Sequence, residues 1–196
     1  MRVISGYLKG RNIDGYDTIG TRPTMNRVKE SMFASIQEYI NDSLVLDLFS
    51  GSGSLGIEAI SMGAKKCYFV DNGREILNIL RKNINNLNIE EKSTIINRDY
   101  REALLYFKNN NIKFNIILVD APYKMEAMNE VIELVNKYNL LEDDGILVLE
   151  YSTDILKDNY SNLRLLKSKK YGDKYVNIYL KVTNKLLKYW YNLFVI

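Results

Sequence analysis

From residue 44 onward, short apolar runs alternate with longer segments in which apolar residues recur every three or four positions. Five of the apolar runs predict buried strands, at 44–49, 66–71, 93–97, 114–120 and 145–151. The segments between them predict helices, at 54–63, 74–87, 102–107 and 126–138. Strands that are apolar throughout and alternate with helices form a parallel sheet covered on both faces. The pattern therefore predicts an α/β fold with a doubly wound, Rossmann-like, mostly parallel sheet.

The two ends of the chain depart from this alternation. Residues 2–5 and 11–13 are short β-like runs separated by glycines, which predicts a short N-terminal β extension. Residues 163–171 and 174–182 flank a Gly-Asp pair, which predicts an antiparallel hairpin at one edge of the sheet. Near the N-terminus, Thr24 precedes apolar residues at helical spacing and is expected to cap a helix.

We therefore expect three segments along the chain. They are an N-terminal extension at 1–31, a main domain at 32–182 and a basic, aromatic tail at 183–196. The tail has apolar residues at helical spacing, which predicts a short helix packed on the main domain. These apolar residues are Leu186, Trp190, Leu193 and Phe194.

The composition excludes several kinds of active site. The chain has no histidine and one cysteine, so Ser-His-Asp triads, histidine-based metal sites and cysteine-rich zinc sites cannot form. We expect no metal and no intrachain disulfide. No apolar run reaches the ~18–20 residues of a membrane-spanning helix, and the N-terminus lacks the apolar stretch of a secretory signal. We therefore expect a cytoplasmic protein, a monomer without membrane contact.

The charge is unevenly distributed, although the net charge is only +3. Residues 1–31 contain six Lys or Arg against three acidic residues, and residues 164–196 contain eight against one. The segment between them therefore has an excess of seven acidic residues. Basic ends around an acidic centre suit a polyanion that touches only part of the surface, which favours a nucleic-acid partner.

A glycine-rich turn follows the first predicted strand. Gly51, Gly53 and Gly56 match the pattern G-x-G-x-x-G between a strand and a helix, the context in which such a turn binds the phosphate or ribose part of a ligand. Asp71 ends the next strand, where an acidic side chain can accept both hydroxyls of a ribose. Asp99, after the third strand, either accepts from the amine of a base or caps the next helix.

Asp47 is a carboxylate inside an apolar strand, directly before the glycine turn. A buried carboxylate without a partner costs several kcal/mol. Asp47 is therefore expected either to accept from backbone N–H groups of the turn or to face a cationic part of a ligand. The pyrophosphate of a dinucleotide would be repelled there, whereas the amino group of S-adenosylmethionine would be attracted.

The fourth predicted strand ends in Asp120-Ala121-Pro122-Tyr123. Ligands of open α/β sheets bind beyond the carboxyl ends of the strands, so this tetrad is expected to share a crevice with the glycine turn. Asp120 and the carbonyl of Ala121 can both accept from an exocyclic amine, and the ring of Tyr123 can stack on a base. Such an arrangement orients the lone pair of the amine toward a methyl donor.

Four segments, in this order and spacing, resemble the bacterial RsmD-like methyltransferases: MRVISGYLKGR, TRPTMNRVKESMF, LDLFSGSGSLGIEA and FNIILVDAPY. The resemblance covers roughly residues 1–182, and its most specific part is the block from Arg22 to Val28. It implies a class I methyltransferase fold and methylation of the exocyclic N2 of a guanine in small-subunit (16S) ribosomal RNA, free or in an assembling subunit. The family pattern has a proline where this chain has Ala121, which implies a looser loop.

The resemblance also implies roles for individual residues. The cofactor would be S-adenosylmethionine, held by Asp47, Ser50, Gly51, Gly53, Asp71, Asn72 and Asp99. The guanine would be held and its amine oriented by Asp120, Ala121, Pro122 and Tyr123. The RNA would be contacted by basic residues near the N-terminus, namely Arg2, Lys9, Arg11, Arg22 and Arg27.

Three other functions are open at this point. The amine acceptor could belong to DNA or to a glutamine side chain of a protein. The chain could also be an RNA-binding protein of the same fold without turnover, for which Ala121 is the support. An NAD-dependent oxidoreductase would fit the glycine pattern, but Asp47, the lack of histidine and the terminal hairpin argue against it.

Overall fold

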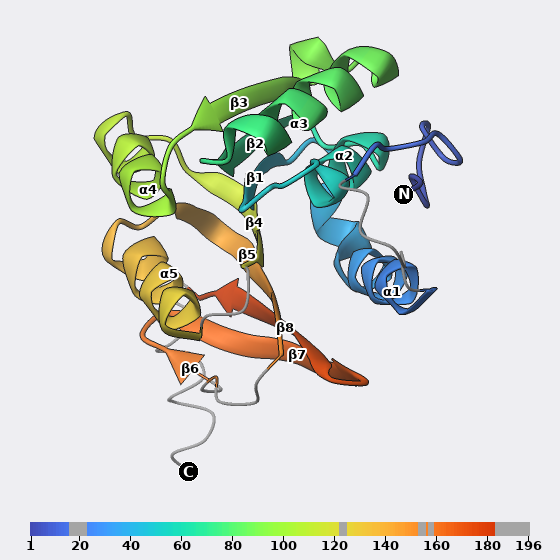
Figure 1. The fold of residues 1–196 in the computed structure, drawn as a ribbon. Coiled ribbons are helices and arrows are strands. Elements are labelled where there is room, and N and C mark those ends of the chain that lie inside the picture. The colour runs from blue at the N-terminus through green and yellow to red at the C-terminus, as the bar shows by residue number, and fades with distance from the viewer. Residues whose placement is uncertain (16–22, 122–124, 153–155, 157–158, 183–196) are drawn as a thin grey trace.

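A computed structural model describes residues 1–15, 23–121, 125–152, 156 and 159–182 (Figure 1). The elements follow one another as α1 (Pro23–Ile40), β1 (Leu44–Leu48), α2 (Ser54–Ser61), β2 (Lys66–Asp71), α3 (Arg74–Leu87), a 3₁₀ turn η1 (Glu90–Lys92), β3 (Ser93–Asn97), α4 (Tyr100–Asn109), β4 (Phe114–Asp120), α5 (Met125–Lys137), β5 (Leu141–Tyr151), β6 (Asn159–Tyr160), β7 (Leu163–Tyr171) and β8 (Lys174–Lys181). Within the described residues, no helix is both long and apolar enough to span a bilayer.

All eight strands belong to one sheet, in the order β3-β2-β1-β4-β5-β8-β7-β6. The pairs among β1 to β5 are parallel, whereas β8 pairs with β5 and β7 in antiparallel fashion. The strand order reverses between β1 and β4, and the crevice above such a reversal is where open α/β sheets bind ligands. The predicted doubly wound sheet with a C-terminal antiparallel hairpin is therefore confirmed.

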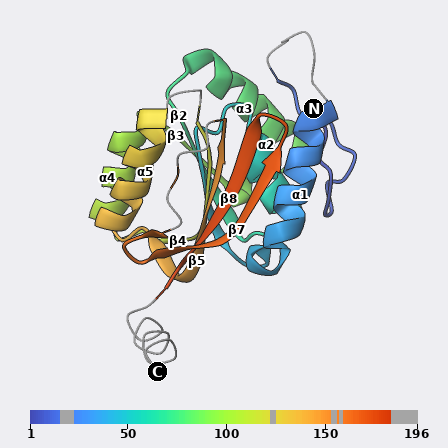
Figure 2. The same ribbon diagram turned by 90° about the horizontal axis from the view of Figure 1, so that it is seen from below.

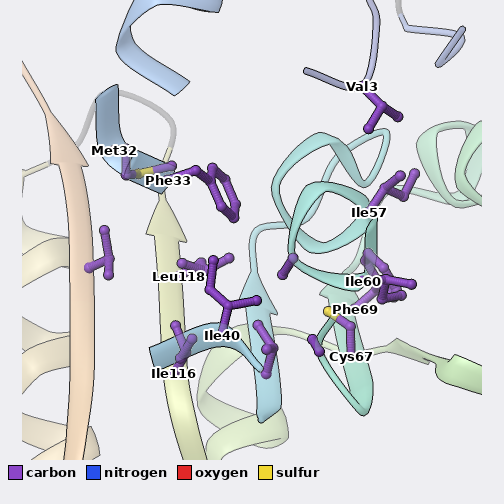
Figure 3. Close-up of a cluster of buried hydrophobic side chains, with 14 of the residues drawn as sticks. Val3, Met32, Phe33, Ile40, Ile57, Ile60, Cys67, Phe69, Ile116 and Leu118 are labelled. Carbon is purple, nitrogen blue, oxygen red and sulfur yellow. The ribbon is translucent and has the colours of Figure 1, made fainter. Parts of the chain in front are cut away.

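The alternation of side chains along the strands produces two buried layers. On one face, β1, β2, β4 and β5 pack against α1, α2 and α3. Figure 3 shows part of this layer, where Met32 and Phe33 of α1, Ile57 of α2 and Leu118 of β4 gather around one core. On the other face the same strands pack against α4 and α5, as the opposite sides of the sheet in Figure 1 show.

The N-terminal segment is tied to the main sheet layer by side chains of α2. Glu58, with no exposed surface, accepts from the backbone N–H groups of Ile4 and Ser5 at 3.0 and 2.6 Å. The sequence predicts a short β extension in this segment, and the structure shows one antiparallel bridge there, between Arg2 and Asn12. The segment is therefore held chiefly by contacts with the domain, and its own strand pairing is short.

Two local predictions differ from the structure, the cap of α1 and the start of β5, which begins at Leu141 and not at residue 145. Helix α1 begins at Pro23, so Thr24 lies in the first turn and is not the cap. Proline suits this position because the first helical N–H groups have no partner inside the helix. Helix α1 also spans the expected boundary between residues 31 and 32. The helix expected in the tail lies outside the described residues.

The C-terminal hairpin returns to the N-terminal half of the molecule. Figure 2 shows β7 beside α1. The hydroxyls of Ser31 and Tyr171 form a hydrogen bond between these elements, and Lys169 Nζ donates to Ser31 Oγ at 3.2 Å. The tip of the hairpin therefore lies at the end of the sheet where β1, β4 and β5 finish.

Candidate active site

The turn after β1 depends on left-handed backbone conformations. Phe49, Gly51 and Gly53 have φ angles of 64°, 54° and 86°, and Gly53 forms the N-cap of α2. A Cβ on Gly53 would lie 2.4 Å from Leu80 Cδ1, so this glycine is required by packing as well as by φ. A Cβ on Gly51 would meet nothing within 4 Å. Gly51 therefore leaves open space at the place where a ligand can approach the backbone.

Asp71 fixes the shape of this turn. Its Oδ2 accepts from the N–H of Gly51 and its Oδ1 from the N–H of Gly73, both at 2.9 Å. Each oxygen of a carboxylate can accept two hydrogen bonds, so both retain one acceptor position. Asn72, the next residue, is exposed. Asp71 thus holds the turn and remains able to accept the two ribose hydroxyls expected from the sequence.

Asp47 is buried, with 2% of its surface exposed, and its Oδ2 accepts from the N–H of Gly56 at 2.8 Å. The pKa of this carboxyl is raised to about 7, chiefly by burial; the Gly56 N–H lowers the pKa and the charges of Asp120 and Asp71 contribute to raising it. The first of the two expected partners, a backbone N–H of the turn, is therefore present. A cationic ligand group beside Asp47 would favour its ionised form.

The structure brings Asp47, Ser50, Gly51 and Asp120 to one pocket of about 180 Å³, whereas Gly53, Asp71 and Asn72 are not among its lining residues. It is lined by Met1, Asn26, Lys29, Asp47, Phe49, Ser50, Gly51, Ser52, Ser54, Leu55, Asp120 and Glu150. Ser50 is 7% exposed, and its Oγ has no hydrogen-bond partner among the described residues. An unpaired buried hydroxyl and the open space at Gly51 both suit a polar ligand in this pocket.

Asp99 lies elsewhere, at the start of α4. Its Oδ1 accepts from the N–H of Arg101 at 2.9 Å, so it caps the helix, the second of the two expected roles. It is absent from the residues that line the pocket. A carboxylate that caps a helix keeps free acceptor positions, so contact with a base remains a prediction.

The ends of β4 and β5 form the part of the pocket that the sequence predicts to hold the methyl acceptor. The register of these strands pairs Asp120 with Glu150. The pKa of Asp120 is raised to about 6, chiefly by burial and then by the charge of Glu150, while Lys174 lowers it. Ala121 is partly buried directly after Asp120. Pro122 and Tyr123 lie outside the described residues, so the stacking role of Tyr123 remains a prediction.

Two pocket residues with charged side chains escaped the sequence reasoning, Lys29 and Glu150. Glu150 is an acidic residue in the apolar strand GILVLEY, which is the signal that identified Asp47. Lys29 Nζ forms an ion pair with Glu58 Oε2 at 2.9 Å and donates to Ser54 Oγ at 3.2 Å. A buried lysine needs such partners, but its sequence position on α1 does not reveal them.

The basic residues expected to contact RNA lie on two elements. Arg2, Lys9 and Arg11 are exposed on the N-terminal segment, and Arg27 is exposed on α1. Arg11 Nη2 donates to the carbonyl of Asn86 at 2.7 Å, so part of its donor capacity is used within the chain. Arg22 lies outside the described residues. Contact of these side chains with RNA remains a prediction.

The chain is similar to proteins that are named as methyltransferases. A family model described as "Conserved hypothetical protein 95" matches residues 1–180. The chain is 36% identical to "Putative rRNA methyltransferase YlbH" of Bacillus subtilis, covering 92% of this chain and 99% of that protein. It is 34% identical to "Ribosomal RNA small subunit methyltransferase D" of Haemophilus influenzae, covering 88% and 89%.

A solved structure supports the same relationship. "Putative methyltransferase yhhF from Escherichia coli" superimposes with a TM-score of 0.81 at 27% identity, covering 93% of this chain and 98% of that one. Family match, sequence identity and shared architecture extend over the sheet and all the elements that line the pocket. The chain therefore belongs to the family described as "Conserved hypothetical protein 95", the RsmD-like methyltransferase family.

Proposed function

We propose that this protein is an S-adenosylmethionine-dependent methyltransferase that acts on the exocyclic N2 of a guanine in bacterial small-subunit ribosomal RNA. The observation that carries the proposal is the pocket that Asp120 lines together with Asp47, Ser50 and Gly51. Support for the substrate class comes from relatives named as small-subunit rRNA methyltransferases at 34% and 31% identity. The choice of guanine N2 rests on the resemblance of the Asp120–Tyr123 segment to amino-group methyltransferases.

S-adenosylmethionine would supply a methyl group on a sulfonium, whose C–S bond breaks toward sulfur as the acceptor nitrogen forms the new C–N bond. The residues of the glycine turn suit this cofactor. Asp71 and Asn72 would accept from the ribose, Ser50 and the backbone at Gly51 and Gly53 would bind the polar part, and Asp47 would face the amino group. Asp99 would contact the adenine amine.

Asp120 orients the acceptor amine in this proposal. Its carboxylate and the carbonyl of Ala121 accept the two N–H groups, which leaves the nitrogen lone pair directed toward the methyl donor. Positioning of two reactants accounts for a large part of the rate of such a reaction. As the nitrogen gains positive charge, the carboxylate of Asp120 stabilises that charge. Pro122 and Tyr123 complete the guanine site, Tyr123 by stacking.

The partner follows from the same proposal. The exposed cations Arg2, Lys9, Arg11 and Arg27, together with Arg22, would contact RNA phosphates. We propose a cytoplasmic, monomeric enzyme that works on ribosomal RNA or on the assembling small subunit, without a metal ion.

Labelled S-adenosylmethionine, purified protein and unmodified small subunits test the proposal. We expect label on one guanine N2, mapped by nuclease digestion and mass spectrometry. Label on an adenine, on DNA or on a ribosomal protein would replace the acceptor in this proposal. Binding of both cofactor and RNA without transfer would instead identify an RNA-binding protein of this fold.

A further inference from the structure

A lysine from the C-terminal hairpin lies beside the carboxylates on the acceptor side of the pocket. Asp120 and Glu150 occupy paired positions on adjacent parallel strands, so their side chains leave the same face of the sheet. Both line the pocket, and Glu150 is 9% exposed. Lys174 Nζ, at the first residue of β8, forms an ion pair with Glu150 Oε1. Two carboxyls and one ammonium thus meet at the end of the sheet.

The other charged groups facing Asp120 have distinct partners. Asp47 of β1 accepts from Gly56, and Lys29 of α1 pairs with Glu58. The α-amino group of Met1, also at the pocket, donates to the carbonyl of Ile13 at 2.9 Å. Glu150 is thus the pocket carboxylate that pairs with a cation of the hairpin, Lys174.

We propose that Glu150 and Lys174 are positioning residues that adjust Asp120 as the proton acceptor of the reaction, Lys174 by favouring its carboxylate and Glu150 by disfavouring it. This inference rests on the proposed function. After the new C–N bond forms, the nitrogen carries one hydrogen too many. Its N–H bond breaks, the electron pair stays on nitrogen, and the proton forms an O–H bond with the Asp120 carboxylate, which later releases it to water.

Electrostatics support this division of roles. The pKa of Asp120 is raised to about 6, with burial and Glu150 raising it and Lys174 lowering it. A base whose pKa lies just below neutral pH is ionised before the reaction and can still hold a proton briefly. Without Lys174, burial and Glu150 would leave Asp120 protonated over more of the neutral range. Without Glu150, it would be a weaker base.

The test replaces each partner and follows Asp120 directly. The variants are Lys174→Met and Glu150→Gln, each with a ¹³C label in the aspartate carboxyl groups, and Asp120→Asn assigns the Asp120 signal. NMR titration of the free protein is expected to move the Asp120 midpoint up by roughly one pH unit in Lys174→Met and down by a similar amount in Glu150→Gln. Opposite shifts distinguish this role from a general loss of packing.

The pH dependence of single-turnover methyl transfer is the second readout. Its acid limb should follow the NMR midpoints, so at pH 6 Lys174→Met should be about fivefold slower than wild type and Glu150→Gln up to about twofold faster. At pH 8 the three rates should converge. If the wild type transfers no methyl group, the proposed function fails. The NMR midpoints still test, independently, whether Lys174 and Glu150 act on Asp120.

The same two strands provide matched controls. At their opposite end, Lys181 Nζ of β8 pairs with Asp143 Oδ1 of β5 at 3.3 Å. Lys181→Met and Asp143→Asn should change the melting temperature but leave the Asp120 midpoint and the acid limb at their wild-type positions. Asp120 midpoints that stay fixed, or move in the same direction, in the Lys174 and Glu150 variants would overturn the inference. The inference would also be overturned if the Asp120 midpoints shift in an active enzyme but the acid limb of its methyl-transfer rate does not shift with them.

Discussion

At the ends of β1 and β2, backbone N–H groups donate to the acidic side chains, whereas at the ends of β4 and β5 the donor is a lysine side chain. Asp47 and Asp71 accept from Gly56, Gly51 and Gly73 at 2.8–2.9 Å. Glu150, 24 residues before Lys174, is paired with that lysine from the hairpin. Backbone donors have fixed geometry, whereas a lysine side chain is flexible and can exchange partners.

This difference suits the two parts of the proposed reaction, cofactor binding and transfer to the acceptor. The cofactor side must present the same shape in every turnover, and a turn held by Asp71 and by Asn83 achieves that. Asn83 of α3 is buried and donates to the carbonyls of Ser52 and Asp14, both at 2.9 Å, so it connects the turn to the N-terminal segment. The acceptor side must change its charge during the reaction, which titratable side chains can do.

The largest effect is expected in the pH dependence of stability on the cofactor side. Burial raises the pKa of Asp47 to about 7, far above the ~3.9 of an unfolded aspartate. Between these pH values the folded protein binds one proton more than the unfolded protein. The stabilisation that this proton contributes therefore decreases as the pH rises from about 4 to about 7. Asp47→Asn keeps an acceptor for Gly56 and removes this titration.

Asp47→Asn should therefore match the wild type near pH 4 and exceed its free energy of unfolding by roughly 3–4 kcal/mol at pH 8. Urea unfolding of both proteins at several pH values measures the difference. A difference that does not change with pH would mean that Asp47 is ionised throughout, and the contrast between the two sides would then be smaller.

On the acceptor side, Asp120→Asn is expected to lower the rate of methyl transfer by ~10²-fold or more. Asparagine retains one acceptor for the amine but can neither stabilise the developing positive charge nor take the proton. Binding of RNA and of S-adenosylmethionine should change by less than tenfold. Single-turnover rates with saturating substrates provide the measurement, and equal rates would remove Asp120 from the mechanism.

Asp71→Ala is expected to weaken cofactor binding, on the cofactor side of the site. Loss of charge-assisted hydrogen bonds to the ribose and to the turn is expected to weaken S-adenosylmethionine binding by ~1.5–3 kcal/mol. Calorimetry with S-adenosylhomocysteine measures this change, with Asp14→Ala as a control, because the Asp14 carboxylate pairs with Lys82 at the surface. Unchanged affinity in a folded Asp71→Ala variant would exclude Asp71 from the cofactor site.

The smallest effect is expected at the exposed cations outside the pocket. Arg27→Ala should reduce the dependence of RNA binding on log salt by ~0.9 or less, the value for one lost phosphate contact, and leave cofactor affinity unchanged. Lys65, exposed just before β2 at the other end of the sheet, provides the matched control as Lys65→Ala. Equal salt dependence in both variants would argue that Arg27 does not reach RNA.

Much of this molecule is determined locally by the sequence. The apolar runs gave β1 to β4 within a residue or two, and the glycine turn followed from its spacing. Asp47 and Asp71 could be identified because one is a carboxylate inside an apolar strand and the other ends the strand that follows the glycine turn. Local chemistry of this kind depends on φ angles and strand ends, which sequence patterns report well.

Other features depended on contacts between distant segments, which only the tertiary structure decided. The sequence placed Glu150 at the end of a strand, but the antiparallel return of β8 brings Lys174 to it. Likewise, the ion pair between Lys29 and Glu58 joins α1 to α2 and locates the N-terminal segment. Side-chain pairs of this kind leave no periodic signal along the chain, because their partners are set by sheet order and helix packing rather than by spacing.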